Sequence, residues 1–343
     1  MAKKKSKTVE FENDPISNQV NKKYGSIVQS GSQVLASLEN FKTIGISPSL
    51  DIALGGGLRE GSCVVMTGDP KTGKTTTALY FAAKAQREGK NVFYFNTEGR
   101  LTKENFKGIK GLDINKIKIV QATDKEPLVS AEKYLNTLEM YIKNTPDLVA
   151  IVDSTSSMVP QDELDGEIRT GVRNALPRLL SMFFKRISGD VGRMKAICIF
   201  ITHNIANTGG SRYSPNKMAD CGNMLQYQAG TNMVITHRGK WEVPKDSGNH
   251  VGQIANWVIK TSAAGGIPNS TAEGWIRYGI GLDECQEVAQ IAKSWLIENE
   301  IKMEPEAIEK AFKFQGMERV TTFLEENPEI TQFIYDQIRE VFV

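Results

Sequence analysis

One loop constrains this chain more than any other feature of its sequence. Residues 68–75 read GDPKTGKT and fit the pattern G-x-x-x-x-G-K-[ST] at every fixed position. The glycines allow the backbone to curl until its N–H groups point at phosphate oxygens. Lys74 adds a positive charge for the β- and γ-phosphates, and Thr75 offers a hydroxyl to Mg²⁺. The pattern therefore predicts a binding site for ATP and Mg²⁺. The residues predicted to line it are Gly68, Asp69, Pro70, Lys71, Thr72, Gly73, Lys74, Thr75 and Thr76.

Apolar runs recur around this loop, and several of them are apolar throughout instead of alternating with polar residues. Such runs are typical of strands that are buried on both faces. Helical or glycine-rich stretches separate them, which predicts βαβ units and an α/β fold with a mainly parallel central sheet flanked by helices. The runs are Cys63–Thr67, Val92–Asn96, Ile117–Gln121, Leu148–Val152, Ala196–Thr202 and Thr231–Thr236.

The composition changes twice along the chain, which predicts three parts. Residues 1–42 are polar and begin MAKKKSK; this basic tip is interpreted as a disordered tail, with a contact to DNA or membrane as the alternative. Residues 43–268 carry the apolar runs and form the predicted core. Residues 269–343 are charged and helical in pattern, which indicates a small C-terminal domain.

Charge and cysteine usage exclude several protein classes. There are 42 Lys and Arg against 40 Asp and Glu, so any DNA-binding surface must be local. The four cysteines are far apart and form no CxxC pair, which favours a reduced, cytoplasmic protein without structural zinc. No apolar run approaches the roughly 18 residues of a membrane span. No apolar stretch follows the basic start, so we do not expect a secretory signal.

Two carboxylates follow predicted strands. Asp153 ends the run Leu148–Val152, and an acid at the C-terminal end of a parallel strand can hold the water shell of Mg²⁺ beside Thr75. Glu98 follows the run Val92–Asn96 and could orient or deprotonate an attacking water. A helix cap or a loop acid is the alternative role for Glu98.

Taken in order along the chain, these features resemble the RecA-type recombinases of bacteria and phages. The resemblance rests on the loop, on Glu98 and Asp153, and on several further segments. Lys23–Val28 resembles a short stretch that docks on a neighbouring subunit, and Phe323–Glu329 resembles the start of the last helix of the family. The remaining segments are Ile44–Leu58, Gly166–Ile168, Ile199–His203 and Cys221–Asn223.

The resemblance implies a RecA-like ATPase core with a short N-terminal oligomerisation segment, and roles for particular residues. Glu98 would be the catalytic base and Phe106 would stack on adenine, with a buried core aromatic as the alternative for Phe106. His203 stands where most of the family has a glutamine that senses the γ-phosphate; a structural histidine is the alternative. Where the family places two lysines that reach the neighbour's ATP, this chain has Lys260 but Ser262.

Two loops are predicted to bind DNA, at about 161–172 and 206–222. Each follows a predicted core strand, and a loop of about 17 residues rich in Gly, Ser and Asn is uncommon without a function. Arg and Lys would neutralise phosphates, and an aromatic ring would stack on bases. A plain flexible loop is the alternative. The candidate residues are Arg169, Arg173, Arg178, Gly209, Gly210, Arg212, Tyr213, Lys217, Gly222 and Asn223.

The sequence thus predicts a DNA-dependent ATPase that assembles on single-stranded DNA and exchanges strands with homologous duplex DNA in recombination and repair. Docking between unlike surfaces builds either a helical filament or a ring, and both outcomes stay open. Loader or single-strand-binding proteins are conceivable partners, and no membrane partner is expected. Two other functions remain open: an ATP-binding mediator that exchanges no strands, which the Ser262 departure favours, and a hexameric helicase-type motor.

Overall fold

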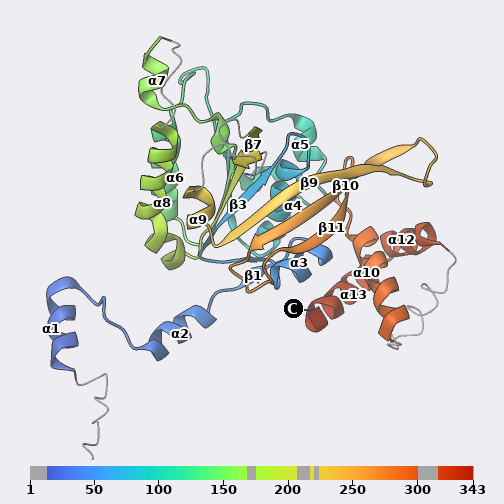
Figure 1. Ribbon diagram of the computed structural model, residues 1–343, viewed down its shortest axis with the longest axis horizontal. Coiled ribbons are helices and arrows are strands. Elements are labelled where there is room, and N and C mark those ends of the chain that lie inside the picture. Colours follow the sequence, from blue (N-terminus) through green and yellow to red (C-terminus); the bar gives the residue numbers. More distant parts are fainter. Residues whose placement is uncertain (1–13, 168–174, 207–216, 220–223, 300–315, 343) are drawn as a thin grey trace, which may run out of the picture. The chain divides into compact units, whose positions relative to one another are not determined.

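The computed structural model describes residues 14–167, 175–206, 217–219, 224–299 and 316–342 (Figure 1). The chain divides into two compact units, residues 1–42 and residues 43–343. Within the described ranges, no helix is both long and apolar enough to cross a membrane.

The first unit contains two short helices, α1 (Pro15–Tyr24) and α2 (Gly31–Glu39). Asp14 caps α1 by accepting hydrogen bonds from the backbone of Ile16 and Ser17, and a capping box between Ser30 and Gln33 begins α2. Neither helix contains a buried residue. The helices are therefore held by local capping and not by burial in a core.

The second unit is built on a large mixed sheet whose parallel half contains all six predicted strands. Along this half the strands lie in the order β5-β4-β6-β7-β3-β9, and every neighbouring pair is parallel. A separate pair, β1 (Thr43–Ile44) and β2 (Leu58–Arg59), precedes it. The six strands are β3 (Ser62–Gly68), β4 (Asn91–Asn96), β5 (Ile117–Val120), β6 (Leu148–Asp153), β7 (Ile197–Ala206) and β9 (Thr231–Glu242).

The other half of the sheet is antiparallel and was not predicted. β10 (His250–Thr261), β11 (Ser270–Arg277) and β12 (Gly281–Leu282) continue the sheet from β9. The prediction that the chain turns helical from about residue 270 is wrong for residues 270–282, because polar residues on one face of a strand resemble a charged helix in composition. The predicted boundary after residue 268 falls between the paired strands β10 and β11. β9 and β10 extend beyond the other strands as a long arm (Figure 1).

Helices cover both faces of the sheet, which explains why the central strands are apolar at successive positions. In β3, Val64 and Met66 pack into the core cluster that includes α4 (Lys74–Arg87) and α3 (Pro48–Leu54). Val65 packs into the opposite cluster. That cluster contains residues of α6 (Ala131–Asn144), α8 (Ala175–Arg193) and α9 (Met224–Gln228). The shorter elements are α5 (Lys103–Lys107), α7 (Gln161–Asp165) and the 3₁₀ turns Ile114–Lys116 and Thr155–Ser157.

The chain ends in α10 (Glu284–Asn299), α12 (Met317–Glu326) and α13 (Pro328–Phe342), which share their own apolar cluster. α13 also reaches the sheet domain through a buried carboxylate. Tyr335 donates a hydrogen bond to Asp51 of α3 at 2.6 Å, and Arg339 pairs with the same carboxylate. Burial raises the pKa of Asp51 to about 6, against the lowering effect of these two partners. The C-terminal helices are therefore tied to the segment that precedes the phosphate-binding loop.

Candidate nucleotide-binding active site

The phosphate-binding loop connects the end of β3 with the first residue of α4, as the strand–loop–helix pattern predicts. Its backbone makes two left-handed turns, at Lys71 (φ 63°) and Gly73 (φ 102°). At Gly68 a side chain is excluded, because a Cβ would lie 2.3 Å from the carbonyl oxygen of Ile235 on β9. The Thr72 hydroxyl donates to the carbonyl of Asp69 at 2.9 Å. The loop is thus fixed in a curled form at a helix N-terminus, an arrangement that binds anions.

Lys74 is the buried cation of this loop, with only 5% of its surface exposed. Its Nζ donates to the carbonyl oxygens of Gly68 at 2.9 Å and Asp69 at 2.7 Å. Burial lowers the pKa of Lys74, and the nearby carboxylates of Asp153 and Glu98 oppose that effect. The Lys74 ammonium is shielded from water and bonded to two carbonyl oxygens. A phosphate that enters the loop would be a stronger hydrogen-bond partner for it, because the phosphate oxygens are charged.

Asp153 and Thr75 meet at the end of β6. The Thr75 hydroxyl donates to Asp153 Oδ2 at 2.6 Å, and the Tyr94 hydroxyl donates to the same oxygen at 2.7 Å. Burial raises the pKa of Asp153, although both hydrogen bonds favour the ionised form. A hydroxyl and a carboxylate are ligands that Mg²⁺ accepts together with waters and phosphate oxygens. The described residues contain no cluster of three or more His, Cys, Asp or Glu that could hold a metal ion.

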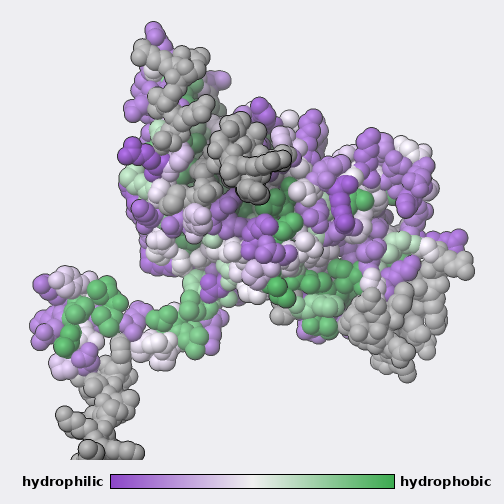
Figure 2. All heavy atoms as spheres, viewed as in Figure 1, coloured by the Kyte–Doolittle hydropathy of each residue, from purple (hydrophilic) through white to green (hydrophobic). Residues whose placement is uncertain are grey.

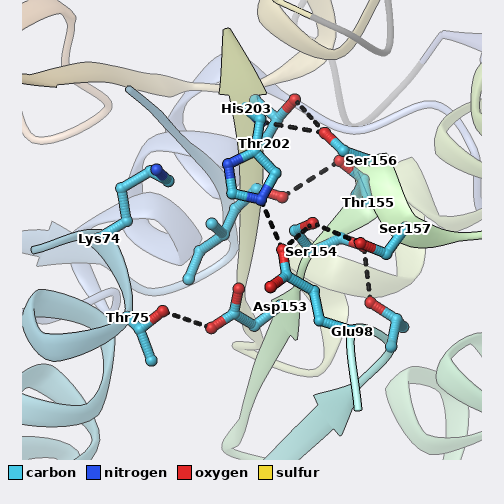
Figure 3. Close-up of polar contacts among 12 residues, drawn as sticks. Lys74, Thr75, Glu98, Asp153, Ser154, Thr155, Ser156, Ser157, Thr202 and His203 are labelled. Carbon is cyan, nitrogen blue, oxygen red and sulfur yellow. Dashed lines mark hydrogen bonds and ion pairs between the residues drawn. The ribbon is translucent and has the colours of Figure 1, made fainter. Parts of the chain in front are cut away.

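Glu98 lies on the opposite side of Asp153 from Thr75 (Figure 3). Its Oε1 accepts a hydrogen bond from the Ser154 hydroxyl at 2.8 Å and lies 2.5 Å from His203 Nε2. Burial acts to raise the pKa of Glu98, but the bonds from His203 and Ser154 outweigh it and hold this pKa below its usual value. An ionised, half-buried carboxylate at a strand end is suited to orient a water and accept its proton.

His203 directly follows the predicted strand Ala196–Thr202 and lies within β7, where neighbouring residues position it. Its backbone N–H donates to the Ser156 hydroxyl at 3.0 Å. Its Nδ1 is buried and has no hydrogen-bond partner among the described residues. The next residue, Asn204, donates to the Asp69 carboxylate of the phosphate-binding loop at 3.4 Å. β7 therefore connects the phosphate-binding loop with the segment that follows Ala206.

These groups line one open cavity of about 550 Å³. Lys74, Thr75, Glu98, Asp153 and His203 all contribute to it. Sequence reasoning missed eight further lining residues, which come from β4, from the segment between β4 and α5, from α5 itself, and from the antiparallel strands and the residue after β11. No local pattern marks the residues of the antiparallel strands, because their position depends on which distant strands pair. The eight residues are Tyr94, Asn96, Arg100, Leu101, Asn105, Gln253, Ile276 and Tyr278.

Comparison with known proteins identifies the family. A model of the RecA N-terminal domain matches residues 13–283 of this chain. The chain belongs to the RecA family. Protein RecA of Clostridium novyi (strain NT) is 28% identical over 335 residues, which cover 94% of this chain and 89% of that protein. Protein RecA of Chlorobium limicola (strain DSM 245 / NBRC 103803 / 6330) is 29% identical over 306 residues, covering 86% and 81%. The predicted resemblance to RecA-type recombinases is confirmed, as is the α/β fold class.

Three residues of the RecA resemblance lie outside the cavity. Phe106 packs against the apolar core and lies edge-to-face on Tyr94 with 6.3 Å between ring centroids, which favours the core alternative. Lys260 is exposed on β10 and donates to Asn269 at 3.1 Å. The Ser262 hydroxyl donates to the carbonyl of Leu54 at 2.5 Å, so it serves the packing of its own chain.

Most of the predicted DNA contacts of this RecA relative fall outside the described residues. This applies to Arg169, Arg173, Gly209, Gly210, Arg212, Tyr213, Gly222 and Asn223. Arg178 lies exposed on α8. Lys217 belongs to a short strand, β8 (Lys217–Ala219), which pairs antiparallel with Asn204–Ala206 of β7. Lys217–Ala219, inside the second predicted loop, therefore lie beside the end of the strand that carries His203.

Proposed function

We propose that this RecA-family protein binds ATP and Mg²⁺ in the cavity around Lys74 and hydrolyses ATP. The observation that carries the proposal is the meeting of a phosphate-binding lysine, a hydroxyl–carboxylate pair and a hydrogen-bonded glutamate in one cavity. Lys74 would hold the β- and γ-phosphates, while Thr75 and Asp153 would hold Mg²⁺ directly or through water. When bound, the metal ion would neutralise charge on the phosphate oxygens.

Hydrolysis then requires only that the attacking water is positioned and that the charge on the phosphate oxygens is stabilised. A water oriented by Glu98 attacks the γ-phosphorus and passes a proton to that carboxylate. The bond between the γ-phosphorus and the bridging oxygen breaks, and the electron pair stays with ADP. The His203 and Ser154 hydrogen bonds keep Glu98 ionised and aimed before the reaction.

We extend the proposal to DNA: the protein would assemble on single-stranded DNA and exchange strands with homologous duplex DNA, with ATPase activity that depends on DNA. Support comes from the family and from the N-terminal unit, whose exposed apolar side chains suit docking on another copy. Ile16, Ile27 and Leu35 of this unit are exposed by 70%, 67% and 58%. Docking between unlike surfaces would produce an open helical polymer or a ring.

His203 is the proposed link between the two ligands. It contacts Glu98 at the nucleotide cavity and lies three residues before the end of β7, where the second predicted DNA loop begins. A γ-phosphate that competes with Glu98 for His203 Nε2 would shift the end of this strand. Affinity for DNA would then rise with ATP, and DNA would favour ATP in return.

Strand exchange with purified protein tests this function most fully. Single-stranded circular DNA and homologous linear duplex are incubated with ATP and Mg²⁺, and joint molecules are followed by gel electrophoresis. We expect joint molecules that require ATP and homology. ATP binding without any exchange would instead indicate the mediator, which the internal hydrogen bond of Ser262 favours. Rings seen on DNA by electron microscopy would indicate the helicase-type motor.

A further inference from the structure

Arg100 enters the nucleotide cavity from the same turn as Glu98. Gly99 between them has a left-handed φ of 65°, with open space around it, and the chain bends at Glu98 and Gly99. The start of this turn is anchored to β6, because the backbone N–H groups of Thr97 and Glu98 both donate to the Asp153 carbonyl. Arg100 and Glu98 both line the cavity that contains Lys74. The guanidinium therefore extends from a turn fixed beside the catalytic carboxylate.

Arg100 differs from several other arginines of the second unit in having no hydrogen bond or ion pair among the described residues, although its charge acts on the nearby Glu98. Arg277, Arg339 and Arg186 each form an ion pair with a buried or half-buried carboxylate. In the part of the chain that the structure describes, Arg100 makes neither a hydrogen bond nor an ion pair, and its side chain is exposed. An unpaired guanidinium at the wall of a cavity is available to a ligand that enters it.

The charges of the cavity indicate which ligand the Arg100 guanidinium would bind. Lys71, Lys74 and Arg100 contribute three positive charges, while Glu98 and Asp153 contribute two negative ones. ATP with Mg²⁺ carries a net charge of about −2 near neutral pH, since the phosphates bring about −4. Lys74 is fixed by the carbonyls of the phosphate-binding loop, at the side where the β-phosphate would lie. Glu98 must face the attacking water, and hence the γ-phosphate, so a cation on the Glu98 turn lies at the γ-phosphate end.

From this placement we infer that Arg100 binds the γ-phosphate of ATP within its own subunit and stabilises the charge that moves onto the phosphate oxygens during hydrolysis. Its planar fork of N–H donors matches two phosphate oxygens, which a lysine cannot do. ADP lacks the group that Arg100 contacts. This inference rests on the proposed ATPase function and adds to it a residue that distinguishes ATP from ADP.

Binding of ADP and of a non-hydrolysable ATP analogue, each with Mg²⁺, tests the inference by calorimetry. The proteins are the wild type, Arg100→Ala, Arg100→Lys and the matched control Arg193→Ala, which removes an exposed arginine at the end of α8. We expect Arg100→Ala to weaken the analogue by roughly tenfold or more and to leave ADP within about twofold. Arg100→Lys should recover part of the loss, and Arg193→Ala should match the wild type.

Two outcomes would overturn the inference about Arg100 and leave the proposed ATPase function intact. Equal affinities in Arg100→Ala and wild type would show that Arg100 does not contact the nucleotide. An equal loss for ADP and the analogue would place Arg100 on another part of the nucleotide or assign it a structural role, and thermal unfolding of the variant separates these two. If the wild type binds neither nucleotide, the proposed ATPase function itself fails.

Discussion

The nucleotide cavity and the N-terminal unit differ in how far their side chains are exposed to solvent. In the cavity, Lys74 and Asp153 are buried and bonded to neighbours in the same chain. In the N-terminal unit no described residue is buried, and large apolar side chains such as Ile16 and Ile27 face solvent. Figure 2 shows hydrophobic surface on the helices of this unit. The cavity brings its proposed catalytic groups together within one chain, whereas the N-terminal unit has apolar surface that its own two helices leave exposed.

Because of this difference, we expect mutations to separate nucleotide turnover from assembly of the protein. Changes in the cavity should alter nucleotide turnover without removing the docking surface. Changes in the N-terminal unit should alter assembly without disturbing the cavity, because its exposed side chains contribute little to the folding of the monomer.

The largest effect is expected for Lys74→Ala. Loss of the buried ammonium removes the cation that faces the β- and γ-phosphates, so ATPase activity should fall by about 10²–10³-fold. Phosphate release assays measure this directly. Self-association without nucleotide, followed by light scattering, should stay at the wild-type level. A variant that hydrolyses ATP normally would contradict the assigned role of the loop.

The second effect concerns the N-terminal unit. Ile27→Asp places a charge on a side chain that is 67% exposed, so the monomer should fold normally. If this residue is buried against a neighbouring copy, self-association should weaken by at least about thirtyfold. Sedimentation velocity measures the assembly, and ADP binding serves as the internal control. An unchanged sedimentation profile would show that this segment is not the docking site.

The third effect concerns His203, the proposed link between the nucleotide cavity and the DNA site. His203→Ala removes the donor proposed to sense the γ-phosphate, so the gain in single-stranded DNA affinity caused by an ATP analogue should shrink by roughly tenfold. Fluorescence anisotropy with and without the analogue measures this gain. His203→Gln keeps a donor and should retain most of it. Should His203→Ala preserve the full gain, nucleotide and DNA are linked by another route.

The smallest effect tests the hydrogen bond from Ser154 to Glu98. This bond favours the ionised carboxylate, so its loss in Ser154→Ala should raise the pKa of Glu98. Because the ionised form acts as base, activity falls as pH drops through this pKa, and the acid limb of the ATPase profile should move to higher pH by up to about one unit. Ser188→Ala, which removes an exposed hydroxyl of α8 that donates to the Lys185 carbonyl, should leave the limb in place. A shift toward lower pH would contradict the assignment.

How well each part of the fold could be predicted depended on the kind of strand. The parallel strands are buried on both faces, so runs such as Leu148–Val152 are apolar without interruption and stand out in the sequence. β11 mixes buried residues with partly exposed polar ones such as Glu273 and Arg277, so its composition resembles that of the charged C-terminal region. The same distinction applies to the site. Lys74, Glu98 and Asp153 follow recognisable runs, whereas Tyr278 and Gln253 enter the cavity only because β10 and β11 pair beside β9.

The ATPase rate of the wild-type protein, measured with and without single-stranded DNA over a range of salt concentrations, tests the central claim most directly. If nucleotide and DNA sites are coupled through β7, DNA should stimulate hydrolysis, and the stimulation should fall steeply as salt weakens phosphate contacts. A rate that is the same with and without DNA at every salt concentration would contradict the account.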